Sequence, residues 1–383
     1  GTTNTITGLL GAWQDSIPCL FLSGQVRFSH MSYGKPVRQV GTQEVNIVDV
    51  VKPLTKYAKT ISSADSIQSE INKAIRISLS GRPGPVWLDL PLEYQWSDVI
   101  FDPKKCKKIT PKYHKPDLSK ELSSFISLLN NSKNPILVLG YGVILSKSET
   151  LVRDFIIKNN LRCVTTWTAA GIFSSEDKHN LGMIGMSGQA GANKVVFNTD
   201  LLICLGSHLS IPHTTTLVES YAPKAKKIFI NIDKDQLNNL NLDSDLSINS
   251  DLSNFMDLIK DVVVNSKNYN KVDTFKKLNS KSKPAKKELV DPNIFFKKLT
   301  SLTDNQTAIV VDGGGTALYT GFQSSLLDQD QVIICSSAIS SMGTGLAETI
   351  GCYMSKNFKD IICIIGDGSM LMNIQDLQSI ADL

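Results

Sequence analysis

The sequence lacks several features that mark specialised classes of protein. It has no uninterrupted apolar run long enough to cross a membrane as a helix. Its net charge of +4 is small for 383 residues. Its lysine-rich runs are broken by Asn, Pro and Ser, which is typical of solvated linkers and not of a polyanion-binding face. We therefore expect no membrane association and no nucleic-acid partner.

Cysteine is present but no two cysteines have the C-x-x-C spacing of metal or redox motifs. The seven cysteines are scattered along the chain as Cys19, Cys106, Cys163, Cys204, Cys335, Cys352 and Cys363. Four of them lie in apolar runs that predict strands, so we expect buried, reduced thiols and a cytoplasmic protein. A G-x-G-x-x-G motif after a strand is also missing, which argues against a nicotinamide dehydrogenase.

The pattern that is present alternates buried strands with amphipathic helices, and it predicts parallel α/β sheets. It occurs in three sets, at residues 1–100, 119–264 and 290–383. Polar stretches between the sets, including residues 265–290, are predicted to be linkers. The predicted fold is therefore α/β, with three doubly wound parallel-sheet domains. The chain starts without a leading strand and stops in mid-helix, so we expect a fragment that is inactive alone.

The most informative stretch is an apolar run, 361–365, followed by Gly366-Asp367-Gly368-Ser369 and a helical pattern over 370–383. The run predicts a strand buried on both faces. Strand, glycine turn and helix would place an acidic side chain and free N–H groups at the carboxyl edge of a sheet, where such folds bind ligands. Asp367 could hold a hard cation that bridges phosphate oxygens. A lone Gly-Asp-Gly is more often an ordinary capped turn.

Other motifs occur with it in a consistent order. They are Gly1-Thr2-Thr3-Asn4, Asp15-Ser16-Ile17-Pro18, Ser23-Gly24-Gln25, Gln43-Glu44, Gly81-Arg82-Pro83-Gly84-Pro85, Asp312-Gly313-Gly314 and Met342-Gly343. With these motifs the sequence resembles the thiamine-diphosphate-dependent enzymes of the acetolactate synthase type over nearly all of its length. The resemblance implies a partial pyrimidine-binding domain, a central Rossmann-like domain and a partial diphosphate-binding domain.

The resemblance also implies roles for particular residues. Asp367 would ligate Mg²⁺, and the Gly366–Ser369 turn would bind thiamine diphosphate, with the N–H groups of Gly368 and Ser369 facing the diphosphate. Met342 would support the bent cofactor, and the backbone at Ser340 and Met342 would face the aminopyrimidine. Gln43 would line the substrate side.

The implied reaction decarboxylates pyruvate and transfers the hydroxyethyl unit to a second 2-oxo acid, as in branched-chain amino acid biosynthesis. The family's activating glutamate would precede Gly1, and its second metal ligand, an Asn, would follow Leu383. The implied assembly is a homodimer or homotetramer. Two alternatives stay open: a decarboxylase or carboligase acting on another 2-oxo acid, and a non-catalytic cofactor-binding subunit.

Some positions depart from the family pattern. Ser187 stands where a His is expected, and Gly206-Ser207-His208 replaces an expected Arg. Thr42 replaces an aromatic residue and Leu92 replaces a Lys. These departures argue against bound FAD and against acetolactate as the product. His208 and His213 lie five residues apart among Thr and Pro, which favours a polar loop over a metal pair.

Overall fold

A computed structural model describes residues 1–105, 116–214, 216–265, 267–280 and 289–383. Cys106 and parts of both expected linkers lie outside these residues. The chain divides into two compact units, Gly1–Tyr113 and His114–Leu383. All strand pairs that the structure describes are parallel, as the sequence predicts.

The first unit contains a three-stranded sheet in the order β1-β3-β2. Its strands and α-helices are α1 (Ile6–Gln14), β1 (Leu20–Gln25), α2 (Ile47–Val51), β2 (Tyr57–Thr60), α3 (Ile67–Leu79), β3 (Val86–Pro91) and α4 (Leu92–Gln95). The central strand β3 is buried because apolar clusters cover both faces of the sheet. Strand β2 is short and carries polar residues, so the sequence pattern did not predict it.

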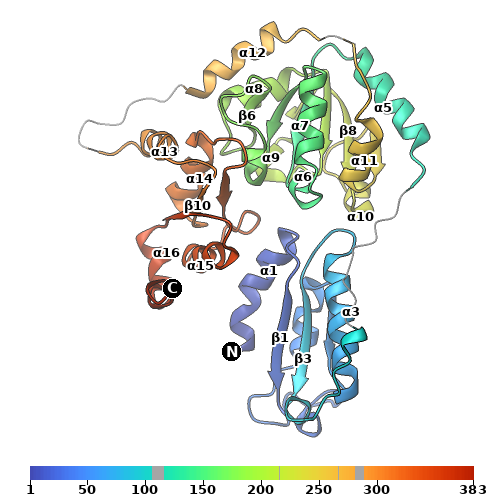
Figure 1. The fold of residues 1–383 in the computed structure, drawn as a ribbon, viewed down its shortest axis with the longest axis vertical. Helices are drawn as coiled ribbons and strands as arrows, with labels where there is room; N and C mark the ends of the chain where they lie inside the picture. Colours follow the sequence, from blue (N-terminus) through green and yellow to red (C-terminus); the bar gives the residue numbers. More distant parts are fainter. Residues whose placement is uncertain (106–115, 215, 266, 281–288) are drawn as a thin grey trace. The chain divides into compact units, whose positions relative to one another are not determined.

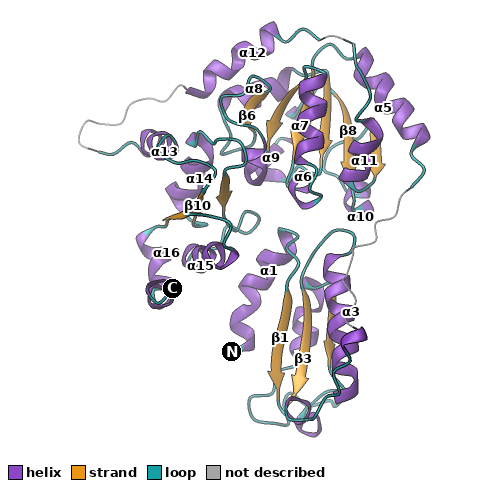
Figure 2. Cartoon of the chain, viewed as in Figure 1, coloured by secondary structure: helices purple, strands orange, loops and turns teal. Residues whose placement is uncertain are grey.

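The second unit contains a six-stranded sheet in the order β6-β5-β4-β7-β8-β9, which is the Rossmann order 3-2-1-4-5-6. Figure 2 shows helices on both sides of it. Its elements are α5 (Ser119–Asn131), β4 (Pro135–Leu139), α6 (Gly142–Leu145), α7 (Glu149–Lys158), β5 (Arg162–Thr165), β6 (Asn180–Met183), α8 (Ala190–Asn198), β7 (Leu201–Leu205), α9 (Ile211–Thr214), β8 (Lys226–Asn231), α10 (Lys234–Asn238), β9 (Leu246–Asn249) and α11 (Leu252–Ile259).

Alternation along the strands builds two separate cores in this sheet. In β4, Leu137 and Leu139 face the cluster formed with α5, α7 and α11. Ile136 and Val138 face the opposite cluster, formed with α8. Successive residues of a strand point to opposite faces, so a strand covered by helices on both sides must be apolar throughout. This is why the sequence predicted β4 and β7 with their observed bounds.

The expectation of an unstructured linker over 265–290 is wrong for its described part. Helix α12 (Asn270–Lys276) and the 3₁₀ helix η8 (Lys277–Ser280) lie within it. Val272 of α12 is buried among apolar residues of the central sheet. The helix is held by tertiary contacts that a local pattern cannot reveal.

A third sheet, in the order β11-β10-β12, also lies in the second unit. Its elements are α13 (Pro292–Thr300), β10 (Thr307–Val311), α14 (Gly315–Ser324), β11 (Val332–Ile334), α15 (Gly345–Ser355), β12 (Asp360–Ile364), α16 (Asp367–Met372) and α17 (Asp376–Ala381). Two expectations fail here. Strand β12 pairs only with β10 and is half-buried, not buried on both faces. The predicted helix over 370–383 is broken, because α16 ends at Met372 and α17 starts at Asp376.

The second and third sheets share one apolar cluster. Trp167, in the 3₁₀ helix η6 (Trp167–Ile172), and Met183 of β6 pack against the core of the third sheet. The ring of Trp167 stacks on that of Phe322 in α14, with 5.3 Å between centroids. The stretches 119–264 and 290–383 therefore lie within one compact unit, and their division into two domains stays a prediction.

Candidate functional site

Three loops, each with at least one glycine, leave the carboxyl ends of the parallel strands β10, β11 and β12. Parallel strands end at the same edge of a sheet, so the loops are brought together there. They contain residues 312–314, 335–344 and 365–366, and each leads into a helix. Figure 1 shows this edge near the start of α15 and α16.

The loops approach each other closely at two glycines. A Cβ added to Gly313 would lie 2.3 Å from the carbonyl carbon of Ser340. A Cβ added to Gly314 would lie 3.3 Å from both Met342 Cγ and Ser369 Oγ. Glycine is required at position 313 because any side chain there would displace the neighbouring backbone. The structure thus brings Ser340, Met342 and Ser369 together around the Asp312–Gly314 turn.

Hydrogen bonds fix the same loops. Asp312 is fully buried, and its Oδ1 accepts a bond of 3.0 Å from the Gly345 N–H at the start of α15. The side-chain amide of Asn373 donates to the Gly343 carbonyl at 2.7 Å. Asn373 thus contacts a neighbouring loop, and it lies where α16 ends.

Asp367 starts α16 and is exposed. Its Oδ1 accepts a hydrogen bond of 2.8 Å from the Gly368 N–H. No heavy atom lies within 4 Å of a Cβ added at Gly366 or Gly368, so the space above this turn is open to an approaching group. Met342 is 49% exposed although it is a large apolar side chain. An exposed thioether and an exposed carboxylate on neighbouring strand-end loops suit a ligand with an organic part and a charged part.

These residues fit a metal-bound diphosphate by the chemistry of their donors. An exposed carboxylate is a ligand for a hard cation, and the open space over Gly366 and Gly368 allows phosphate oxygens to approach. In addition, Asp312 Oδ2 is buried and has no hydrogen-bond partner among the described residues. A buried acceptor without a donor is unfavourable, so this edge has capacity for a further polar partner. Asp312 was not among the predicted site residues, although it follows a buried strand as Asp367 does.

Gln43 lies in the first unit, in an exposed turn with a left-handed φ of 65°. The neighbouring Glu44 holds this turn, because its carboxylate accepts hydrogen bonds from the N–H groups of Ser32, Val40 and Gly41. Hydrogen bonding to this carboxylate, first from the Ser32 side chain and then from these N–H groups, lowers the pKa of Glu44 to about 2. The role of Gln43 on the substrate side stays a prediction.

The positions expected to contact FAD lie in the loops after β4, β6 and β7. The β4 and β7 loops are pressed together: a Cβ added to Gly142 would lie 2.6 Å from the Gly206 Cα, and the Gly142 N–H donates to the Gly206 carbonyl at 3.0 Å. These loops flank the switch point of the Rossmann order, where a dinucleotide would bind. Ser187 is buried and His208 is exposed.

His213 lies in the same region, in helix α9. Its Nδ1 lies 3.0 Å from Ser210 Oγ, and its ring packs edge-on against Trp167. Burial lowers the pKa of His213 to about 4, so it is neutral near pH 7. The described part of the chain has no group of three or more His, Cys, Asp or Glu side chains placed to hold a metal ion.

In the same described residues, no helix is both long enough and apolar enough to cross a membrane. The fold and the loop cluster define an α/β protein with a polar ligand-binding edge at its third sheet. Comparison with known families gives this edge an identity. Residues 122–259 match the thiamine pyrophosphate enzyme central domain, and residues 312–383 match the thiamine pyrophosphate enzyme C-terminal TPP-binding domain. The two matches cover more than half of the chain, which belongs to the thiamine pyrophosphate enzyme family.

The curated proteins to which the chain is similar include acetolactate synthases and acetolactate synthase large subunits. The chain is 27% identical to the acetolactate synthase isozyme 1 large subunit of Escherichia coli over 389 residues, 100% of this chain and 66% of that protein. It is 29% identical to the chloroplastic acetolactate synthase 2 of Nicotiana tabacum, over 99% of this chain and 57% of that protein. It is also 29% identical to a probable acetolactate synthase large subunit of Methanocaldococcus jannaschii, covering 66% of that protein. The chain therefore spans less than two thirds of each of these three relatives.

Proposed function

We propose that this chain is part of a thiamine-diphosphate-dependent enzyme of the acetolactate synthase type. The proposed reaction decarboxylates pyruvate and joins the remaining two-carbon unit to a second 2-oxo acid. The observation that carries the proposal is the meeting of three strand-end loops around Gly314, with exposed Met342 and Asp367 beside it. The match of the same residues to a TPP-binding domain supports it.

When bound, thiamine diphosphate supplies the electron sink that stabilises a carbanion. The residues of this chain would bind and orient it. The Asp367 carboxylate would hold Mg²⁺, while the N–H groups of Gly368 and Ser369 would donate to the diphosphate. Met342 would offer an apolar surface to the organic part, and the backbone at Ser340 would face the aminopyrimidine. Gln43 would contact the 2-oxo acid.

We propose a homodimer or homotetramer in the cytoplasm, because in this family the cofactor lies between two subunits. Light scattering of the purified protein tests the assembly, and a strictly monomeric active enzyme would contradict it. FAD is not part of the proposed site.

The test of the reaction uses the complete protein with thiamine diphosphate, Mg²⁺ and pyruvate. We expect pyruvate consumption that requires both thiamine diphosphate and Mg²⁺, with a product longer than pyruvate. Acetaldehyde as the sole product would instead support a simple decarboxylase. Tight cofactor binding without turnover of pyruvate or any other 2-oxo acid would refute the enzyme and favour a cofactor-binding subunit.

A further inference from the structure

A cavity of about 440 Å³ lies within the second unit, between the edge strand β6, helix α12 and the end of helix α14. It is separate from the loops around Gly314 and from the pressed loops at Gly142 and Gly206, because none of those residues lines it. Its volume is in the range of small-molecule sites, which is about 300–1,000 Å³. None of the roles proposed above uses it.

The floor of the cavity is apolar and already in place. Met183, Phe322, Leu327 and Ile333 line it, and all four are buried in the cluster shared by the second and third sheets. Phe322 is held by its stacking on Trp167. A ligand would therefore meet a preformed apolar surface, which lowers the ordering cost of binding.

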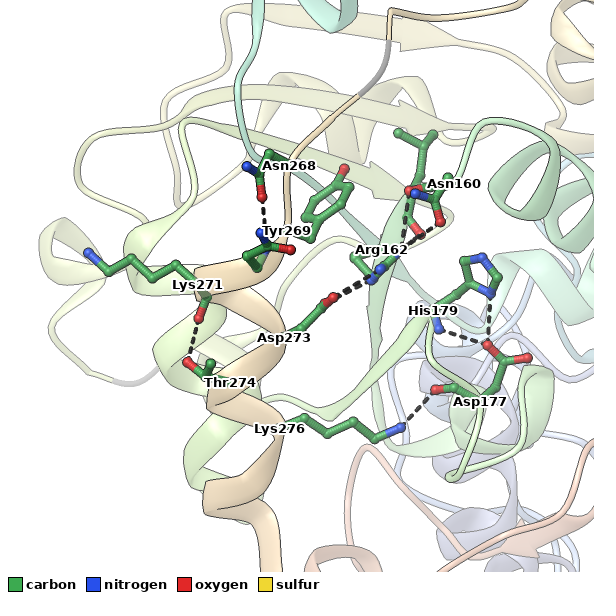
Figure 3. Close-up of polar contacts among 12 residues, drawn as sticks. Asn160, Arg162, Asp177, His179, Asn268, Tyr269, Lys271, Asp273, Thr274 and Lys276 are labelled. Atoms are coloured by element: carbon green, nitrogen blue, oxygen red, sulfur yellow. Dashed lines mark hydrogen bonds and ion pairs between the residues drawn. The ribbon is translucent and has the colours of Figure 1, made fainter.

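The rim of the cavity carries more positive than negative side chains. Lys276, Lys277 and Lys297 line it together with Glu176 and Asp273. The Asp273 carboxylate is engaged by Arg162, with N–O distances of 2.8 Å and 3.0 Å, as Figure 3 shows. The charge of one of the two acidic side chains, Asp273, is therefore already paired with Arg162. The rim presents an excess of ammonium groups to a ligand.

The lysines of the rim differ in what they already bind. The Lys276 ammonium donates to the Asp177 carbonyl at 2.7 Å, as Figure 3 shows. The Lys297 ammonium, by contrast, has no hydrogen-bond or ion-pair partner among the described residues, although Lys297 is half-buried. A half-buried ammonium at the edge of an apolar cavity is suited to pairing with an anion.

The polar amides of the wall are already used by the protein. The Asn279 side chain accepts from the Gly191 N–H and donates to the Leu181 carbonyl. Gln189 accepts from the Met183 N–H and donates to the Gln323 carbonyl. These bonds hold the wall in shape and leave few polar groups for a ligand. A ligand with many hydroxyl or amide groups would lose hydrogen bonds to water without replacing them.

We propose that this cavity is a second small-molecule site, which binds an organic monoanion with an apolar body, such as a medium-chain carboxylate. The apolar body lies on Met183, Phe322 and Leu327, and the carboxylate pairs with Lys297. The proposal does not depend on the reaction at the thiamine diphosphate site.

The test uses 8-anilinonaphthalene-1-sulfonate as a fluorescent probe and octanoate and 1-octanol as competitors. These two competitors have the same chain but differ in charge. We expect saturable probe fluorescence, and octanoate should displace the probe at a concentration roughly fivefold or more below that of octanol. Octanol displacing the probe as well as octanoate does would overturn the assignment of an anion site.

Two variants on α13 make the test specific. Lys297→Gln should weaken the binding of octanoate roughly fivefold and leave the binding of octanol unchanged. Lys298→Gln should change the affinity for either competitor by no more than about twofold. Lys298 is the matched control because it is the next residue on the same helix and does not line the cavity. Equal effects of the two substitutions would refute pairing with Lys297.

A third variant tests the location of the apolar body. Leu326 lines the cavity and is 38% exposed, so Leu326→Trp can fill the opening without disturbing the buried core. We expect saturable probe binding to be lost in Leu326→Trp while the circular dichroism spectrum is unchanged. Undiminished binding in the folded variant would place the probe elsewhere and overturn the proposal.

Discussion

Gly313 and Ser340 are in backbone contact, and a Cβ on Gly313 would stand 2.3 Å from the Ser340 carbonyl carbon. This contact joins the loop after β10 to the loop after β11. It depends on a residue without a side chain, because real Cβ atoms essentially never approach a backbone carbon so closely. The turn that carries Met342 is therefore positioned by Gly313.

Gly313→Ala should displace the Ser340–Met342 turn. We expect the free energy of unfolding to fall by about 1–3 kcal/mol, as for other overpacked sites. Thiamine diphosphate affinity, measured by calorimetry with Mg²⁺, should fall about tenfold or more, or ~1.4 kcal/mol. The control is Gly351→Ala in α15, where no heavy atom lies within 4 Å of the added Cβ. That control should raise stability by about 0.5–1 kcal/mol. Equal behaviour of the two variants would count against the positioning role.

Asp367→Asn removes the charge that we assign to Mg²⁺ binding. Affinity for thiamine diphosphate in the presence of Mg²⁺ should fall about tenfold or more, which is ~1.4 kcal/mol. Asp360→Asn is a suitable control, because Asp360 is exposed at the other end of β12. The control should keep its cofactor affinity. Unchanged affinity of Asp367→Asn by calorimetry would remove Asp367 from the site.

The purified protein should carry no flavin. Ser187 and His208 stand where flavin-contacting residues are expected by resemblance, and the loops at Gly142 and Gly206 are in backbone contact at the switch point. We expect the purified protein to show no flavin absorption band in its visible spectrum. A stoichiometric flavin band in the protein as purified would contradict this prediction.

Residues buried on both faces made much of the fold predictable. Strands β4 and β7 are apolar throughout and β10 is apolar after Thr307, so their pattern alone identifies them. Strands β2 and β9 are short and partly polar, with the sequences Tyr57–Thr60 and Leu246–Asn249, and no local signal distinguishes them from loops. Helix α12 depends on contacts with residues more than 100 positions away, which include the Arg162–Asp273 pair. Tertiary contacts of this kind are not encoded in local periodicity.

The candidate site was predictable where glycine and aspartate follow a buried strand. This rule identified Asp367 and its turn from the sequence. It did not reveal that Asp312 would be fully buried against the Gly345 N–H, because that contact requires two loops to meet in space. The same limit applies to Gln43. It lies in the first unit, so local sequence cannot show whether it meets the loops of the third sheet.

Asp273→Asn should loosen α12 from the central sheet. The Arg162 guanidinium is almost fully buried, pairs in bidentate fashion with Asp273 and lies 4.8 Å from the ring centre of Tyr269. Loss of the carboxylate leaves a buried charge without its partner. For a fully buried pair, this lowers the free energy of unfolding by about 3–5 kcal/mol. Asp273 is partly exposed, so solvent screening should reduce the loss of stability to about 1–3 kcal/mol. Urea denaturation measures this loss.

The control for the Arg162 pair is Asp257→Asn, which breaks an exposed pair with Lys260. Exposed pairs contribute about 0–1 kcal/mol, so this variant should unfold at nearly the wild-type urea concentration. A loss at Asp273 no larger than that at Asp257 would show that α12 is held by its apolar contacts alone.

Asp89 in β3 should make the first unit less stable as pH rises. Its carboxylate is buried and accepts hydrogen bonds from Ser23 at 2.6 Å and Gln25 at 3.0 Å. Burial is the largest influence and raises the pKa of Asp89. Folding therefore favours the neutral acid, whose unfolded pKa is about 3.9. The contribution of Asp89 to the free energy of unfolding should be largest below that value, and it should fall as the pH rises from there through the raised pKa.

Asp89→Asn removes this dependence on pH. The two Asp89 oxygens accept from two different donors, the Ser23 hydroxyl and the Gln25 amide, so an asparagine at position 89 can keep only one of these bonds and would direct its own N–H at the other donor, which should cost about 1–3 kcal/mol. The stability advantage of the wild type over Asp89→Asn should therefore be larger near about pH 4 than near about pH 7. Urea denaturation at both pH values measures it, with the exposed Asp65→Asn as a control that should show almost no difference. An advantage that grew with pH would show that the Asp89 anion stabilises the fold, and would contradict the raised pKa.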